Sequence, residues 1–466
     1  MTAGQGPDLD LGHPLVVGFG VTGRAVARAL VSRGHRPTVI EDRAGDAHRE
    51  AASGLGVRLV EGPDDADLAG LAAEATVLLP SPGVPDHHPI FAAAAEAGLP
   101  TASEFDLAQR WDDRTVVALT GTNGKTTVTM MVADALNRSG VPAEAVGNTD
   151  VPFVEAIDRP ETRVFVVEAS SFRLGHSHRF RPDVAAWLNF APDHLDAHAT
   201  LDDYEAAKAS IWADLPAGAT VVANAEDPVV AEHVPAAGPE LTVRRFALAD
   251  PTTGTPSSSA SPADWRVDVV DGVRTLVGPD GPLVAVERLR RSQPHDVANA
   301  LATAAIATAG GATTAGIVDT LTSFEGLPHR LEYLGSWGDV AWYNDSKATV
   351  PHATVAAVGG FDSVVLIAGG YDKGLPFEPL RATVPPVRTV VAIGDAAPKI
   401  DSVFGDLVPV TRAESMRAAI ATARSVAEAG DAVLLSPACA SFDWYPNYVQ
   451  RGLDFSALVR EEVGTR

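Results

Sequence analysis

Short apolar runs alternate with amphipathic stretches along most of this chain, and that alternation is typical of parallel α/β folds. The clearest run covers residues 115–119, whose β-branched content and length indicate a buried parallel strand. Residues 128–138 follow with apolar positions at helical spacing, which predicts a helix. Comparable runs, each of which we expect to be a strand, lie at 15–17, 37–42, 57–60, 76–79, 164–168, 184–188, 340–343, 364–368, 390–393 and 432–435.

Helical and hairpin patterns fill the intervals between these strands. Residues 264–286 alternate in polarity around two Asp-Gly turns, which predicts a small β-meander. Residues 251–262 are rich in Pro, Ser and Thr, a composition typical of a flexible loop. Further helices are expected at 24–33, 201–215, 296–309 and 314–322.

Length and rhythm together predict three domains. A chain of 466 residues is too long for a single hydrophobic core. We place the domains at 1–113, 114–326 and 327–466, and we expect a mostly parallel sheet with flanking helices in each. The first domain is expected to be Rossmann-like, the second to resemble a P-loop ATPase, and the third to be Rossmann-like again.

Composition and charge narrow the class of protein. The formal net charge of −24 argues against a nucleic-acid or anionic-membrane surface. Any anionic substrate must therefore be met by local Lys, Arg, backbone amides and Mg²⁺. The lone cysteine, Cys439, excludes an internal disulfide and is expected to be a packed thiol in a reducing compartment. Because residues 1–14 lack a basic segment followed by an apolar one, and no run approaches membrane-spanning length, we expect a cytoplasmic protein.

A candidate phosphate-binding loop follows the clearest strand. Residues 120–127 read Thr-Gly-Thr-Asn-Gly-Lys-Thr-Thr and open the helix at 128–138. In such a loop, backbone N–H groups point at phosphate oxygens, Lys125 would neutralise a β- or γ-phosphate, and the Thr126 hydroxyl can ligate Mg²⁺. Leu119 stands where the full pattern has glycine, so the match is the Gly-Lys-Thr half with a shortened loop. The alternative interpretation is a plain strand–helix turn.

A second glycine-rich turn lies in the first domain. Residues 18–23 form a complete G-x-G-x-x-G after a strand, and Glu41 and Asp42 follow about 20 residues later. These carboxylates indicate either contacts to ribose hydroxyls or ordinary solvated strand ends. The turn at 81–85 is expected at the same sheet edge. His87 and His88 beyond it are expected to be solvated.

Several polar residues follow core strands of the second domain. Glu168 ends a buried strand beside the phosphate loop, an arrangement typical of a metal contact; the alternative is a paired strand-end carboxylate. His194 lies among carboxylates after another strand and is a candidate for the same site. His176 and His178 are expected at the surface. Periodicity alone gives Lys208 no role, because a lone helical lysine is normally solvated.

Two nucleotide-type loops in one chain leave three hypotheses. The first is an ATP-dependent ligase in which one domain holds a nucleotide-bearing substrate, the next holds MgATP and the third brings the second substrate. The second is a dinucleotide-dependent oxidoreductase in which Lys125 is dispensable. The third is a non-enzymatic nucleotide-sensing or assembly protein that uses the phosphate loop as a switch.

Eight motifs then occur in one order along nearly the whole chain, at 18–23, 120–127, 168–172, 189–194, 204–208, 326–330, 344–349 and 436–441. In this respect the chain resembles the Mur ligase family of cytoplasmic peptidoglycan-precursor enzymes, and within it the member that adds D-glutamate. The resemblance implies an ATP-dependent amide ligase that acts through an acyl phosphate. It also makes the first glycine turn a UDP site, which removes the main support for an oxidoreductase.

The resemblance assigns roles position by position. The residues implied for the UDP-sugar substrate are Gly18, Gly20, Val21, Thr22, Gly23, Glu41, Asp42, Arg43 and Ser81. Those implied for ATP are Gly121, Thr122, Asn123, Gly124, Lys125, Thr126, Thr127, Asn148, Asn299, His329, Arg330 and Asp345. Those implied for the amino acid are Thr349, Lys373, Ser441, Phe442 and Tyr448. The implied catalytic residues are Lys125, Glu168, His194, Lys208 and Lys347, and the implied metal-binding residues are Thr126, Glu168, His194 and Lys208, with Lys208 carbamylated.

The implied cofactors are ATP and Mg²⁺ at two sites, and the implied substrates are UDP-N-acetylmuramoyl-L-alanine and D-glutamate. We expect a monomer without nucleic-acid partners or membrane insertion. An L-glutamate-adding relative would carry similar motifs, so the stereochemistry stays open. Two positions depart from the family pattern: Asp150 replaces a glycine, and Asp296 replaces an asparagine near the expected nucleotide.

Overall fold

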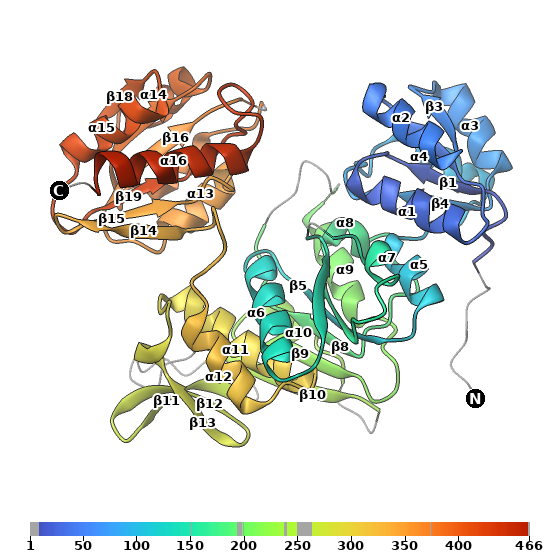
Figure 1. Cartoon of the computed structure of the whole chain (residues 1–466), viewed down its shortest axis with the longest axis horizontal. Helices are drawn as coiled ribbons and strands as arrows, with labels where there is room; N and C mark the ends of the chain where they lie inside the picture. The colour runs from blue at the N-terminus through green and yellow to red at the C-terminus, as the bar shows by residue number, and fades with distance from the viewer. Residues whose placement is uncertain are drawn as a thin grey trace. The chain divides into compact units, whose positions relative to one another are not determined.

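The computed structural model describes residues 9–149, 151–192, 198, 200–236, 240–248, 263–372 and 374–464. The chain divides into two compact units, Met1–Phe324 and Glu325–Arg466. Three sheets organise it, two in the first unit and one in the second (Figure 1). Within the described ranges, every helix is too short or too polar to cross a lipid bilayer.

The first sheet has four parallel strands in the order β3-β2-β1-β4. The strands are β1 (Pro14–Val17), β2 (Thr38–Glu41), β3 (Arg58–Glu61) and β4 (Val77–Pro80). The helices of this region are α1 (Val21–Ser32), α2 (Asp46–Leu55), α3 (Asp65–Glu74), α4 (Pro89–Ala97) and α5 (Glu104–Trp111). Val16 enters one core cluster while Leu15 and Val17 enter another, so helices cover both faces of the sheet.

The second sheet has nine strands in the order β13-β12-β11-β10-β9-β8-β5-β7-β6. Its strands are β5 (Thr115–Thr120), β6 (Ala143–Gly147), β7 (Val164–Glu168), β8 (Val184–Trp187), β9 (Thr220–Asn224), β10 (Thr242–Ala247), β11 (Trp265–Val270), β12 (Val273–Gly278) and β13 (Gly281–Ala285). Its helices include α6 (Lys125–Arg138), α7 (Phe153–Ala156), α8 (Ser171–Leu174), α9 (Leu201–Ala209), α10 (Pro228–His233), α11 (Pro294–Ala309) and α12 (Thr314–Ser323). Only β11–β13 pair antiparallel, as a meander added to one edge of the parallel strands.

The buried strand β5, which lies between β8 and β7, has helices packed against both of its faces. Val117 and Leu119 pack with α6 and α11, whereas Val116 and Ala118 enter the core on the opposite face. That opposite core also contains Val16 of β1, so one apolar cluster connects the first two sheets. This continuity is why residues up to Phe324 form a single compact unit.

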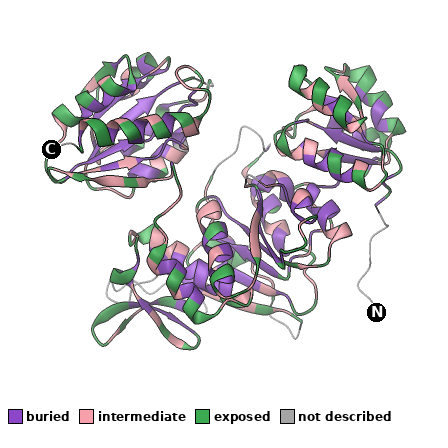
Figure 2. Ribbon diagram, viewed as in Figure 1, coloured by how far each residue is buried: buried purple, intermediate pink, exposed green. Residues whose placement is uncertain are grey.

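The second unit contains one six-stranded sheet in the order β14-β15-β19-β16-β17-β18. Its strands are β14 (Glu332–Trp337), β15 (Val340–Asn344), β16 (Val364–Gly369), β17 (Val387–Ile393), β18 (Val410–Ala413) and β19 (Ala432–Leu435). Its helices are α13 (Pro351–Val358), α14 (Ala397–Phe404), α15 (Met416–Val426) and α16 (Tyr448–Glu462). Successive residues of β16 alternate between two core clusters, and Figure 2 shows the sheet buried between helices with exposed outer faces.

The predicted α/β fold class is confirmed, and each strand expected from an apolar run is present, with bounds within a few residues. The strands β6, β9, β10, β14 and β18 were not expected. The helix expected at 201–215 is wrong in length, because α9 ends at Ala209 and a 3-10 turn follows. There the Ser210 hydroxyl donates to the carbonyl of Ala207 at 2.7 Å, which competes with the helical hydrogen bonds.

Candidate active site

The phosphate loop lies between β5 and α6, as its sequence predicts. The Lys125 Nζ atom donates to the carbonyls of Gly121 and Thr122, at 2.7 and 2.8 Å. This ammonium group is therefore held over the loop itself. The hydroxyls of Thr126 and Thr127 belong to the first turn of α6, where helix N–H groups lack helical partners.

A glycine at position 124 is required by its backbone and by its neighbour. Gly124 has a φ of +81°, in the region that favours glycine. A Cβ atom there would lie 2.5 Å from the side-chain oxygen of Asn299 on α11. The same distance places Asn299, a predicted ATP contact, against the phosphate loop.

The loop is braced by Asn189, which begins the motif at 189–194 but was given no role from the sequence. The Asn189 side-chain oxygen accepts from the backbone N–H groups of Thr122 and Asn123, at 3.0 and 2.8 Å. Its amide nitrogen donates to the carbonyl of Asn123 at 3.1 Å. Asn189 follows β8, the sheet neighbour of β5, so these bonds tie the loop to the adjacent strand.

Lys208 is buried beside the phosphate loop rather than solvated. It is 1% exposed, and its Nζ donates to the carbonyl of Gly121 at 2.8 Å, the same oxygen that Lys125 contacts. Its ammonium also lies 4.5 Å from the ring centre of Tyr204, whose hydroxyl contacts Thr122. The expectation that a lone helical lysine is solvated is therefore wrong for Lys208, and the two lysines donate to one carbonyl.

Glu168 has the features that a metal contact requires. The side chain is 1% exposed, and its buried Oε2 atom has no hydrogen-bond partner among the residues that the structure describes. The Asn148 amide donates to the other oxygen, Oε1, at 2.9 Å. An unpartnered buried carboxylate oxygen is costly unless a cation or donor meets it, and hard divalent cations prefer such oxygens. Across the described residues no group of three or more His, Cys, Asp or Glu side chains is assembled for a metal. His194 lies outside them.

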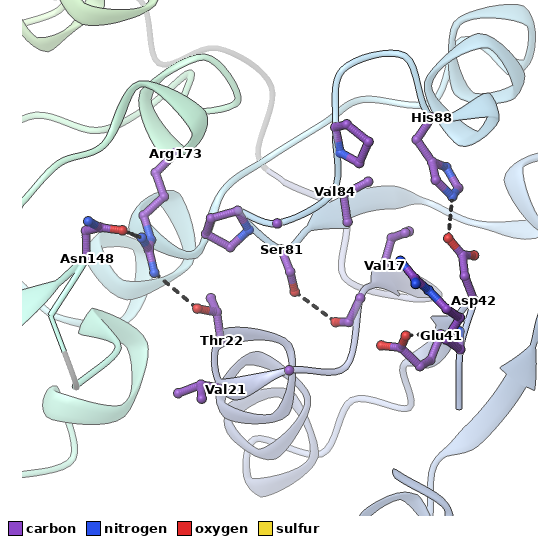
Figure 3. A pocket seen from close by; sticks show the side chains of 16 residues that line it. Val17, Val21, Thr22, Glu41, Asp42, Ser81, Val84, His88, Asn148 and Arg173 are labelled. Carbon is purple, nitrogen blue, oxygen red and sulfur yellow. Dashed lines mark hydrogen bonds and ion pairs between the residues drawn. The ribbon is translucent and has the colours of Figure 1, made fainter. Parts of the chain in front are cut away.

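A cavity of about 580 Å³ opens at the glycine turn of the first sheet (Figure 3). The predicted UDP-substrate residues line it with one exception, Gly23. A Cβ at Gly23 would lie 1.9 Å from the carbonyl oxygen of Gly18, so this glycine permits the close turn instead. The Ser81 hydroxyl donates to that same carbonyl at 2.8 Å. The lining consists of Val17, Gly18, Gly20, Val21, Thr22, Glu41, Asp42, Arg43, Ser81, Pro82, Gly83, Val84, Pro85, His88, Asn148 and Arg173.

The two carboxylates beside the cavity already have partners. Glu41 accepts from the backbone N–H groups of Phe19 and Arg43, at 2.8 and 3.2 Å. Asp42 contacts His88 Nε2 at 3.1 Å, and His88 also caps α4 through Nδ1. The expectation that His88 is solvated is wrong, since only 11% of its side chain is exposed. Glu41 therefore stabilises the glycine turn, and Asp42 and His88 form a polar part of the cavity lining.

Arg173 was not selected from the sequence, yet it forms one end of the cavity. This residue of α8 is 6% exposed, and each guanidinium nitrogen has an acceptor. Nε donates to Glu104 at 2.7 Å, Nη1 donates to the Asn148 side-chain oxygen at 2.8 Å, and Nη2 donates to the Thr22 hydroxyl at 3.1 Å. No local pattern marks such a residue, because its partners come from three distant segments.

Asp296, the departure noted in the sequence, is paired on α11. Arg291 Nε donates to its carboxylate at 2.9 Å, and His295 Nε2 lies 3.4 Å away. Burial lowers the pKa of His295, against the opposing effect of Asp296. Arg291, Asp296 and Asn299 line a small cavity together with Thr127 of the phosphate-loop helix. The acidic side chain is thus offset by a neighbouring cation.

The second unit holds the remaining predicted nucleotide residues in one region. His329 Nδ1 accepts from the Asn344 amide at 3.0 Å, while burial lowers the pKa of His329. The imidazole is therefore neutral near pH 7, with its proton on Nε2. Asp345 accepts from the Leu331 N–H at 3.2 Å and from the Ser436 hydroxyl at 2.8 Å, and Arg330 lies between His329 and Leu331 in the chain.

Of the predicted amino-acid residues, Ser441 and Phe442 precede α16, Tyr448 begins it, and Thr349 lies between β15 and α13. Lys347 Nζ lies 5.3 Å from the ring centre of Tyr448, and the Thr349 N–H donates to the carbonyl of Lys347 at 2.8 Å. Ser441 is 2% exposed, whereas its neighbour Phe442 is 65% exposed. Lys373 lies outside the described residues. Cys439, 2% exposed, is the packed thiol that was expected.

Three family models match consecutive parts of the chain. They are the MurD-like N-terminal domain of Mur ligases at residues 12–103, the Mur ligase middle domain at 119–307 and the Mur ligase glutamate ligase domain at 329–439. The chain belongs to the Mur ligase family.

Individual relatives match over almost the whole chain. A Frankia casuarinae protein named UDP-N-acetylmuramoylalanine–D-glutamate ligase is 41% identical over 97% of this chain and 94% of its own length. A protein of the same name from Nitrosococcus oceani is 36% identical, covering 96% of each chain. The solved UDP-N-acetylmuramate–alanine ligase of Thermotoga maritima matches with a TM-score of 0.56 at 17% identity, over 97% of this chain and 99% of that one. At that identity the structural likeness shows the fold alone.

Proposed function

We propose that this protein joins D-glutamate to UDP-N-acetylmuramoyl-L-alanine, using ATP and releasing ADP and phosphate. Both relatives reported above carry the name of that activity. The glycine-turn cavity would take the UDP-sugar, the phosphate loop would take ATP, and the second unit would take the amino acid. We propose the boundaries 1–113, 114–326 and 327–466 for these three parts, and a monomer acting in the cytoplasm.

One observation carries the proposal. Asn148 lines the glycine-turn cavity and also donates to Glu168, the acid beside the phosphate loop. A substrate that fills the cavity would therefore extend to within one side chain of the place where a metal and triphosphate are expected. This adjacency is what transfer of a phosphoryl group from ATP to the sugar-linked carboxylate requires.

The chain's own residues supply the charge for this step. Lys125 and the first-turn N–H groups of α6 would hold the triphosphate once the ammonium leaves its carbonyl partners. Glu168 Oε2 would hold a magnesium ion together with His194 and a carbamylated Lys208, and Thr126 would meet the ion of the nucleotide. Bound magnesium would neutralise phosphate charge, so that the substrate carboxylate can approach phosphorus.

The remaining chemistry follows from the acyl phosphate. The γ-phosphoryl group would pass to the carboxylate of the alanine, leaving ADP. The deprotonated amine of glutamate would then attack the carbonyl carbon, and phosphate would leave. Asn299, His329, Arg330 and Asp345 are proposed for ATP, and Lys347 for a catalytic or substrate contact. The glutamate carboxylates are proposed to bind the group Thr349, Lys373, Ser441, Phe442 and Tyr448.

The use of lysine supports these roles. Of the 36 Lys and Arg residues, five are lysine, at positions 125, 208, 347, 373 and 399. Four of the five stand at proposed site positions, while arginine serves nearly everywhere else. Arginine stays protonated and is not interchangeable with lysine at a reactive or point-charge site. Retention of lysine at these positions is therefore expected if their chemistry needs an amine.

A phosphate-release assay tests the proposal. The full chain with MgATP and UDP-N-acetylmuramoyl-L-alanine is given D-glutamate, L-glutamate, meso-diaminopimelate or L-alanine in separate reactions. We expect D-glutamate to stimulate release well above the others. Stimulation by L-glutamate instead would identify another amino-acid-adding ligase, and stimulation by none would contradict ligation.

A further inference from the structure

Arg173 and Asn148 lie together at one side of the glycine-turn cavity (Figure 3), and Asn148 donates to Glu168. Two residues of that cavity, Arg173 and Asn148, come from the region of the second sheet, whereas the others come from the first. The Arg173 guanidinium touches both regions, because it donates to Thr22 of α1 and to Asn148 beyond β6. A ligand that enters the cavity would therefore contact Arg173.

The contact with Arg173 fixes which way the Asn148 amide points. Asn148 accepts from Arg173 through its side-chain oxygen and donates to Glu168 Oε1 through its amide nitrogen. A flipped amide would direct its N–H groups at the guanidinium and its oxygen at the carboxylate, and both contacts would become repulsive. With the amide held this way, Oε1 of Glu168 is engaged, and the buried Oε2 has no hydrogen-bond partner within the described part of the chain.

The charges around the cavity favour an anion beside Arg173. Glu41 and Asp42 are already engaged by local partners. Glu104 accepts from Arg173 Nε at 2.7 Å, and burial raises the pKa of this carboxyl although Arg173 opposes the rise. Among the described residues, Arg173 Nη2 donates only to a neutral hydroxyl, that of Thr22, the second residue of the twelve-residue helix α1. A phosphate oxygen at that helix N-terminus would be a stronger acceptor for Nη2 than the hydroxyl.

We propose that Arg173 is a positioning residue that links phosphate occupancy of the glycine-turn cavity to the metal-facing orientation of Glu168, through the Asn148 amide. The inference rests on the proposed function, which assigns a sugar nucleotide to the cavity and a divalent cation to Glu168. Phosphate bound to Arg173 fixes the position of the guanidinium, and the guanidinium fixes the orientation of the Asn148 amide. The amide in turn holds Glu168 with Oε2 directed to the cation. Linkage is reciprocal, so the sugar nucleotide and the cation each strengthen the binding of the other.

Manganese binding to the full chain tests this coupling without turnover. Electron paramagnetic resonance measures free Mn²⁺ in the presence of a non-hydrolysable ATP analogue, with and without UDP-N-acetylmuramoyl-L-alanine, and without glutamate. For the wild type we expect the sugar nucleotide to tighten Mn²⁺ binding about fivefold or more, the usual range for coupled sites. For Arg173→Gln we expect that ratio to fall close to one, and the sugar nucleotide to bind more weakly.

Two further variants separate positioning from folding and from general contact between the two regions. The double variant Glu104→Gln with Arg173→Met removes both members of the buried charge pair, so no lone carboxylate is left behind; we expect the same loss of coupling. Arg33→Gln breaks a contact made by the residue that follows α1, to Asp158 at 2.7 Å, away from the cavity lining. We expect Arg33→Gln to keep the wild-type ratio.

The outcomes distinguish the inference from the proposed function. A wild-type ratio near one in a protein that ligates normally, or a wild-type ratio retained by both Arg173 variants, would overturn the coupling alone. Loss of coupling in Arg33→Gln would also overturn it, because contact between the two regions would then suffice. A wild type that neither binds the sugar nucleotide nor releases phosphate with any amino acid would overturn the proposed function.

Discussion

At the scale of single residues, the site is defined by polar atoms held in unusual surroundings. Lys125 and Lys208 share the carbonyl of Gly121, and one buried oxygen of Glu168 has no partner in the described ranges. Such arrangements cost stability in the absence of ligands, and they are typical of places where function rather than packing selects the residue. They also indicate which substitutions should affect chemistry before they affect the fold.

Lys208→Ala should abolish ligation, because the proposed carbamate would no longer supply an anionic oxygen to the metal. Rates are measured by phosphate release with D-glutamate, with and without a short carboxylate such as formate. Partial rescue by the carboxylate is expected, since it can occupy the space that the side chain leaves. Full activity of the variant in the absence of carboxylate would remove Lys208 from the reaction.

Gly124→Ala should weaken ATP binding strongly. The new Cβ would meet the Asn299 oxygen at 2.5 Å, and an alanine at this φ also costs about 1 kcal/mol. We expect the KM for ATP to rise tenfold or more. Gly218→Ala is a matched control, because Gly218 has a φ of +88° and no atom of a described residue lies within 4 Å of its Cβ position. Equal effects on KM in both variants would trace the change to backbone strain alone.

The sequence predicted residues whose roles follow from local pattern, and missed those whose roles follow from distant partners. Lys125 and the glycines at 18–23 stand in recognisable strand–loop–helix settings. Asn189 and Arg173 do not, because each acts by contacts with segments far away in the chain. Glu168 could be selected from its strand-end position, whereas its unpartnered oxygen required the surrounding side chains.

At the scale of elements, the parallel strands position the candidate site residues, and side-chain hydrogen bonds and ion pairs connect neighbouring strands. Apolar runs identified the buried strands well, since a strand buried on both faces reads as continuous hydrophobicity. Edge strands such as β14 and β18 were missed, because their half-buried patterns resemble loops. Asp431 shows how the opposite end of one sheet is secured. Its carboxylate contacts Arg388 of β17 and accepts from the Ser363 hydroxyl at 2.6 Å, just before β16.

Asp431→Asn should destabilise the second unit in a pH-dependent way. Burial acts to raise the pKa of Asp431, but the hydrogen bonds from Arg388, from the Glu428 N–H and from Ser363 outweigh it, so the pKa is lowered. At pH values well above the ordinary Asp pKa of about 3.9, the free energy of unfolding of the wild type should therefore exceed that of the variant by a constant amount. This difference should shrink as the pH falls below that pKa. Because Arg388 is partly exposed, we expect the free energy of unfolding to differ by about 2 kcal/mol near pH 7, a value between those for exposed and buried ion pairs.

Thermal melts between pH 8 and pH 3 measure this difference. Asp406→Asn serves as a control, because its pair with Arg381 is exposed and such pairs contribute little. A difference between wild type and Asp431→Asn that grows on acidification would contradict the assignment.

At the scale of the whole molecule, two units with separate cores should respond separately to ligands and substitutions. The glycine-turn cavity lies entirely within the unit that ends at Phe324, and Asp431 lies entirely within the other. We expect calorimetry to show two transitions. UDP at 100 times its Kd should stabilise the first by about 2.7 kcal/mol, and Asp431→Asn should lower only the second. A single transition whose temperature responds both to UDP and to Asp431→Asn would contradict independent units.

The Asn189 brace has a consequence for how the protein emerges from the ribosome. β5 is made early, but its sheet neighbour β8 and the amide that holds Thr122 and Asn123 are synthesised some seventy residues later. A nascent chain that stops short of Asn189 would carry the complete Gly-Lys-Thr sequence without its brace. Nucleotide affinity should thus arise during translation only once that asparagine is free to fold back.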